Sequence, residues 1–139
     1  MKKFFKYQVI VILAIIVLSF FFDLNSAHIE NVKMCTELSG DQCTSDVPIF
    51  EVNSPQIVVS AELKNPPSDT QVEFTWNYVS NGTTKIDAVI LNSGDNIGTL
   101  ELHSSLSRPN NGWPQGDYEV VIKILDTEKE PIVKSFYVR

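Results

Sequence analysis

Two cysteines, Cys35 and Cys43, are the side chains best suited to covalent chemistry in this sequence. The residues between them include Gly40 and Asp41, which favour a turn that brings the two thiols together. Metal binding needs further ligands, and thioredoxin-like redox catalysis uses the spacing Cys-x-x-Cys, which this pair lacks. The pattern predicts a structural disulfide, worth about 2.6 kcal/mol for a loop of about nine residues. Free thiols are the alternative.

His103, followed by Ser104 and Ser105, is the closest approach to a nucleophile beside a base. Neither serine lies in a Gly-x-Ser-x-Gly turn, and no positioned base or oxyanion turn accompanies them. We interpret His103 as a strand residue on a sheet face. A hydrolase therefore rests on no recognisable constellation, and the sequence predicts no enzyme, no catalytic residue and no cofactor.

Acidic residues cluster at Asp41 with Asp46 and at Asp126 with Glu128 and Glu130. A calcium loop places its oxygen ligands at alternating positions, and neither cluster has that pattern. We interpret both clusters as solvated charge, with a weak surface calcium site as the alternative for either. The sequence predicts no metal site.

The loop Arg-Pro-Asn-Asn-Gly-Trp-Pro-Gln-Gly at residues 108–116 is the best candidate for contact with a partner. Loops at the ends of β-domains carry recognition, and Arg and Trp are common interface anchors. Arg108 and Trp113 are therefore the candidate contact residues. In the alternative interpretation, which we favour, Trp113 folds over the open end of the domain and caps its core.

The N-terminus resembles a targeting segment, with basic residues at Lys2, Lys3 and Lys6 followed by an apolar run at residues 9–22. This is the layout of a secretory signal peptide. Counted over residues 4–22, the segment nearly reaches the length of a spanning helix. Ala27 suits the position before a cleavage site, but Asn25 stands where a small residue is preferred. A cleaved signal and an uncleaved anchor both remain open, and both place the domain outside the cytoplasm.

The chain is acidic, with a net charge of −6 at pH 7. Its N-terminal lysines belong to the targeting segment, so the part that folds is more acidic still. An acidic surface repels phosphate backbones and anionic lipids. We therefore expect no nucleic-acid partner, and membrane contact only through the N-terminal segment.

Residues 48–139 show the repeated alternation of apolar and polar residues that predicts β-strands. About seven strands are expected, at 49–52, 56–63, 71–79, 85–91, 99–106, 118–125 and 132–138. Turn residues separate them, and no helical periodicity occurs after the N-terminal segment. The sequence predicts an all-β antiparallel sandwich preceded by a hydrophobic helix. Its expected core residues are Phe74, Trp76, Tyr118 and Phe136.

The segments Phe-Thr-Trp-Asn-Tyr around Trp76 and Gly-Trp-Pro-Gln-Gly-Asp-Tyr-Glu-Val around Tyr118 resemble small exported immunoglobulin-like domains of prokaryotes. The resemblance covers residues 50–139 and implies an immunoglobulin-like fold. It says almost nothing of function, because such sandwiches host many roles. The two cysteines precede the sandwich, so an antibody-type domain with a disulfide between its sheets is not implied.

Three regions are therefore expected: a signal or anchor at 1–27, a disulfide-containing linker at 28–47 and an immunoglobulin-like sandwich at 48–139. The predicted function is a non-enzymatic, exported binding module at the cell envelope, whose partner is a protein or a surface polymer. The alternative is a membrane-anchored accessory subunit of an envelope complex.

Overall fold

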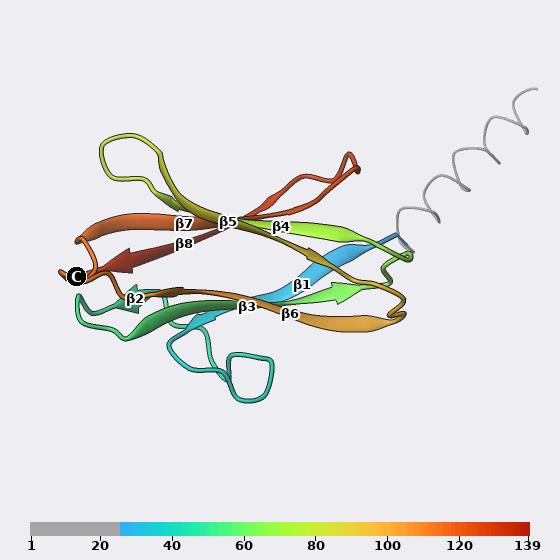
Figure 1. Ribbon diagram of the computed structural model, residues 1–139, viewed down its shortest axis with the longest axis horizontal. Helices are drawn as coiled ribbons and strands as arrows, with labels where there is room; N and C mark the ends of the chain where they lie inside the picture. Colours follow the sequence, from blue (N-terminus) through green and yellow to red (C-terminus); the bar gives the residue numbers. More distant parts are fainter. Residues whose placement is uncertain (1–25) are drawn as a thin grey trace, which may run out of the picture.

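The computed structural model describes residues 26–139. Within that range the regular elements are all β-strands, which confirms the all-β class (Figure 1). The strands are β1 (His28–Cys35), β2 (Ile49–Phe50), β3 (Gln56–Lys64), β4 (Gln71–Tyr78), β5 (Thr84–Asn92), β6 (Thr99–Ser107), β7 (Gly116–Ile124) and β8 (Ile132–Val138). The predicted hydrophobic helix and the signal or anchor at residues 4–22 lie outside the described residues. From residue 26 onward, no helix is long and apolar enough to cross a membrane.

The strands form two sheets that face each other across a shared core (Figure 1). The smaller sheet has the order β1-β3-β6, and the larger has the order β2-β8-β7-β4-β5. Neighbouring strands are antiparallel except for β2 and β8, which run parallel. The edge strands are therefore β1 and β6 in the smaller sheet and β2 and β5 in the larger sheet.

β1 lies within residues 28–47, which were predicted to be a linker, and for this strand the prediction is wrong. The first part of that segment pairs with β3 and belongs to the smaller sheet. The register shifts between Glu30 and Lys33, and Asn31 has a φ of 53°, so a bulge interrupts the strand. The bulge breaks the two-residue alternation by which strands are predicted, and β1 was missed for that reason. The predicted strands correspond to β2–β8.

All four aromatic residues predicted for the core are buried, namely Phe74, Trp76, Tyr118 and Phe136. The ring centroid of Phe136 lies 5.9 Å from that of Trp76 and 5.1 Å from that of Tyr118. The Trp76 indole N–H donates a hydrogen bond to Ser104 Oγ on β6 at 3.0 Å. Because an unpaired buried donor costs about 1–3 kcal/mol, this bond satisfies the indole and links the two sheets at their centre.

Apart from the segment between β1 and β2, which covers the outer face of the smaller sheet, the loops lie at two opposite ends of the sandwich (Figure 1). At one end, Asn65 N–H donates to Gly98 O and Asp69 N–H to Gly94 O, so the β3–β4 and β5–β6 loops are joined there. Ser26, which precedes β1, lines a cavity here together with Asn65 and Pro67, and we call this the Ser26 end. The opposite end holds the β4–β5 and β6–β7 loops and the C-terminus.

Candidate functional site

The predicted contact loop at residues 108–116 packs against the turn between β2 and β3. The Trp113 side chain is only 3% exposed, and its indole N–H donates to Ser54 O at 2.7 Å. Its backbone N–H donates to Val52 O at 2.9 Å. Exposed Arg108 reaches the same turn, where Nη1 donates to Asn53 O at 3.1 Å. The structure therefore places Trp113 in the core as a cap, and its ring is not available to a partner.

The rest of this loop is held by two tyrosine hydroxyls. Tyr118 OH donates to Pro114 O at 2.5 Å, and Tyr78 OH donates to Gln115 O at 2.8 Å. Gly116 follows with a φ of 144°, and a Cβ at this position would lie 2.7 Å from Tyr78 Oη. Burial, with a further contribution from neighbouring Tyr78, raises the pKa of Tyr118 to about 12. The two hydroxyl hydrogen bonds therefore attach the loop to β4 and β7.

The predicted disulfide is confirmed, because Cys35 and Cys43 are joined by an S–S bond. Both cysteines are buried and form a small apolar cluster with Val58, against which Leu38 packs. The backbone N–H of Cys43 donates to the hydroxyl of Ser60 on β3 at 3.0 Å. The disulfide therefore fastens the loop after β1 to the smaller sheet, on the face opposite the main core.

A single glutamine ties this disulfide loop to two carboxylates. Gln42 Nε2 donates to Glu62 Oε1 at 3.0 Å and to Glu101 Oε1 at 2.8 Å. Glu62 and Glu101 are cross-strand partners on β3 and β6, where like charges repel. Hydrogen bonds from Asn31, Lys64 and Gln42 lower the pKa of Glu62, so its charged form is stabilised. These carboxylates hold the loop in place.

Asp46 connects the disulfide loop to both sheets. Its Oδ1 accepts a hydrogen bond from Met34 N on β1 at 2.8 Å, and its Oδ2 pairs with Lys134 Nζ on β8 at 2.5 Å. Burial alone would raise the pKa of Asp46, but the bonds from Lys134 and Met34 outweigh it and the pKa is lowered. Asp46 therefore has a structural role where the chain passes from one sheet to the other.

The side chains that could do chemistry are kept apart. His103 is exposed on β6, whereas its neighbour Ser104 is buried and accepts the hydrogen bond from Trp76. Successive strand residues point to opposite faces, so His103 and Ser104 do not form a base–nucleophile pair. Among residues 26–139, no three His, Cys, Asp or Glu side chains are grouped closely enough to hold a metal ion.

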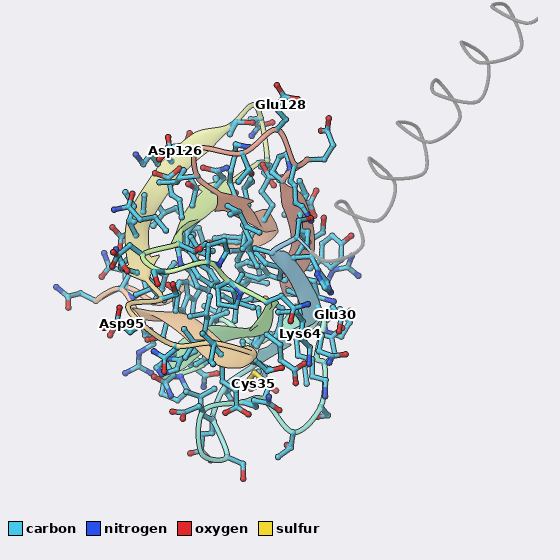
Figure 2. All side chains as sticks on the ribbon, turned by 90° about the vertical axis from the view of Figure 1, so that its right-hand side faces the viewer. Glu30, Cys35, Lys64, Asp95, Asp126 and Glu128 are labelled. Atoms are coloured by element: carbon cyan, nitrogen blue, oxygen red, sulfur yellow. A yellow bond between two sulfur atoms is a disulfide. The ribbon has the colours of Figure 1, made fainter. Side chains whose placement is uncertain are left out.

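The Ser26 end carries an open cavity of about 690 Å³ between the β3–β4 and β7–β8 loops. Its lining includes the apolar residues Ala27 and Pro67 as well as Asp126 and Glu128. Figure 2 looks onto this end and shows Asp126, Glu128 and Asp95 at its periphery. All three acidic residues are exposed, and for Asp126 and Glu128 this agrees with their interpretation as solvated charge.

β5 is an apolar edge strand. Large apolar side chains are exposed on it at Ile86, Val89 and Ile90, and Ile90 is 50% exposed. The strand pairs with β4 on one side and with no described strand on the other. An unpaired strand edge can add a strand from another chain, and alternate side chains then contribute specificity. β5 is therefore the candidate binding surface. Alternation in the sequence carried no signal for this assignment, because it does not show which strand lies at an edge.

No protein-family model matches the sequence, and no curated protein matches it. Among solved structures, the chain is similar to Pseudomonas fluorescens alkylpurine DNA glycosylase AlkC bound to DNA containing an abasic site analog. The two are 13% identical with a TM-score of 0.49, and the match covers 81% of this chain and 30% of that chain. The chain thus spans less than a third of that protein's length, and a likeness at this level carries no argument about function.

Proposed function

We propose that this chain is an exported, non-enzymatic binding module with an immunoglobulin-like fold. Two facing sheets, antiparallel except for the short β2–β8 pair, support the fold assignment. A second support is the hydrogen bond from Tyr118, near the start of β7, back to Pro114, since immunoglobulin-like domains have a tyrosine of this kind. The Cys35–Cys43 disulfide supports a location in an oxidising compartment outside the cytoplasm.

The open edge of β5 is the observation that carries the binding role. Edge strands of soluble proteins are usually shielded, because exposed apolar edges invite pairing with other chains. Val89 and Ile90 are exposed on adjacent positions of β5, so apolar side chains are accessible on both faces of the strand. The partner, a protein or a surface polymer, contacts this edge in our proposal, and the loop at 108–116 supports the fold.

Site-specific photo-crosslinking in the producing cells tests this proposal. A photoactivatable amino acid is placed at Ile90 of the full-length protein, and a matched variant carries it at Ser135. Ser135 is exposed on β8 of the same sheet but lies away from the β5 edge. We expect a crosslinked product from position 90 and little from position 135. Equal or absent crosslinking at the two positions would show that β5 is not the binding surface.

The alternative function, a membrane-anchored accessory subunit, is favoured by the segment at residues 4–22, which nearly reaches the length of a spanning helix. The intact mass of the protein, measured without reductant in membrane and soluble extracts of its own cells, separates the two functions. A mass that starts near His28, with two hydrogens missing, supports the secreted binding module. A full-length mass confined to the membrane supports the anchored subunit.

A further inference from the structure

Residues 88–92 of β5 form a regular and open backbone edge. Ser93 N–H donates to Thr70 O at 2.8 Å, so the backbone groups of Ser93 point toward the strand that pairs with β5. Backbone groups point alternately to the two sides of an antiparallel strand. The residues whose N–H and C=O groups point away from β4 are therefore Ala88, Ile90 and Asn92.

The first half of β5 is shielded. The register with β4 skips Ile86, which is an extra, bulged residue. Asp87 Oδ1 accepts a hydrogen bond from Ala88 N at 2.8 Å, and this agrees with an Ala88 N–H that points away from β4. Bulges and charged side chains both hinder pairing along an edge. The open stretch is therefore limited to residues 88–92.

This open stretch is complementary to itself. It has the sequence Ala-Val-Ile-Leu-Asn and carries no charge. If two copies pair antiparallel about Ile90, each Ile90 lies opposite its equivalent, each Val89 lies opposite Leu91, and each Ala88 lies opposite Asn92. Every residue that directs its backbone groups outward then meets another such residue, as an antiparallel ladder requires. Apolar side chains meet at the centre, and small and polar side chains meet at the two ends.

Charge favours a second copy at this edge over the other edges of the sandwich. Two copies of a chain with a net charge of −6 repel each other across most of their surface. The edge strand β1 carries Glu30, and the edge strand β6 carries Glu101. β2 is too short to form a ladder. Residues 88–92 therefore provide the uncharged edge at which identical copies can approach.

We propose that two copies of this chain pair antiparallel through residues 88–92, with the two-fold axis at Ile90, and join their larger sheets into one continuous sheet. The inference rests on the proposed binding function, because it names a second copy as the partner of β5. Leu91 already packs against the core cluster, so the pairing extends the core across the two-fold axis. β5 ends close to the Ser26 end. In the proposed dimer the Ser26 ends of the two copies therefore lie side by side at the centre, and the two sandwiches extend from there in opposite directions.

Disulfide trapping in the full-length protein tests both the partner and the register. In an Ile90→Cys variant, the two introduced cysteines face each other with a Cα–Cα distance of about 5.5 Å, within the range that a disulfide spans. The matched control is Ala88→Cys, whose two cysteines are offset by about 13 Å along the strands. On a non-reducing gel of protein recovered from its own cells, we expect a linked dimer from Ile90→Cys and none from Ala88→Cys.

The other outcomes are distinguishable. A dimer linked through position 88 would overturn the register. A disulfide between position 90 and a different protein would overturn the second copy as partner, while the proposed binding function would stand. If position 90 forms no product in this experiment or in the photo-crosslinking, the dimer and the proposed function both fail.

Sedimentation equilibrium of the purified full-length protein provides a measurement without introduced cysteines. Ile90→Lys places two like charges at the two-fold axis and should lower the dimer association constant by about tenfold. Ser135→Lys, which adds the same charge on β8, should leave it unchanged. Asp87→Ala frees the Ala88 N–H to donate to the second copy, and this variant should raise the dimer association constant by about threefold. A parent protein and an Asp87→Ala variant that both stay monomeric would refute the proposal.

Discussion

Replacing Trp113 with alanine removes the side chain that joins the β6–β7 loop to the turn after β2. The ring is 3% exposed and belongs to the main core cluster, so its removal leaves a cavity. Truncation of a buried tryptophan to alanine costs about 3–5 kcal/mol. In a domain of this size that loss lowers the melting temperature by about 10–20 °C. Thermal unfolding followed by circular dichroism measures the shift.

Two further variants separate the contributions of the loop. Trp113→Phe keeps an aromatic ring but leaves Ser54 O without its donor, and should cost about 1–3 kcal/mol. Arg108→Ala removes an exposed side chain and should cost less than about 1 kcal/mol. If Trp113→Ala melts within a few degrees of the parent protein, the cap interpretation is wrong.

Three further predictions concern other parts of the fold. Tyr118→Phe should lower the free energy of unfolding by about 1 kcal/mol. Burial raises the pKa of Tyr118 from 10.0 to about 12, so the parent protein should also lose stability as the pH rises between these values, and the variant should lose less. Equal losses for the two proteins between pH 9 and pH 11 in urea titrations would contradict this. The double variant Cys35→Ser/Cys43→Ser should lose about 2–3 kcal/mol in urea unfolding, and an unchanged midpoint would show that the disulfide does not stabilise the fold. The pKa of Glu62 is lowered below 4.5, chiefly by the hydrogen bond from Asn31. The charged carboxylate therefore contributes to the stability of the fold above pH 4.5, and this contribution is lost as the pH falls through the lowered pKa. Glu62→Gln should therefore differ from the parent more at pH 7 than at pH 3, and an equal difference at both would contradict the assignment.

The central strands β4 and β7 of the larger sheet could be predicted because they alternate regularly. In β4, Val72, Phe74 and Trp76 are all buried and the residues between them face outward, so the pattern revealed the strand and its core face together. The disulfide was also predictable, since only two cysteines exist and the segment between them can turn. Both inferences depend on residues close together in the chain.

The role of Trp113 remained open between two interpretations until its environment was known. A tryptophan in a loop of Gly, Pro and Asn is compatible with a surface contact as well as with the cap that we favoured. Ser54, the acceptor of its indole N–H, lies on a distant turn that only the folded chain brings close. β1 was missed for a related reason, since its bulge hides a strand that pairing with β3 makes evident.

The sequence by itself determined the all-β class, the strands β2–β8, the aromatic core and the disulfide, because each follows from residue type and short-range spacing. The tertiary structure alone decided that Trp113 is buried, that Ser104 accepts the hydrogen bond from Trp76 on the face opposite His103, and that residues 88–92 form an open edge. The physical reason is that alternation shows which face of a strand is buried, whereas the strand order, and with it the edges, arises from pairings between residues far apart in the chain.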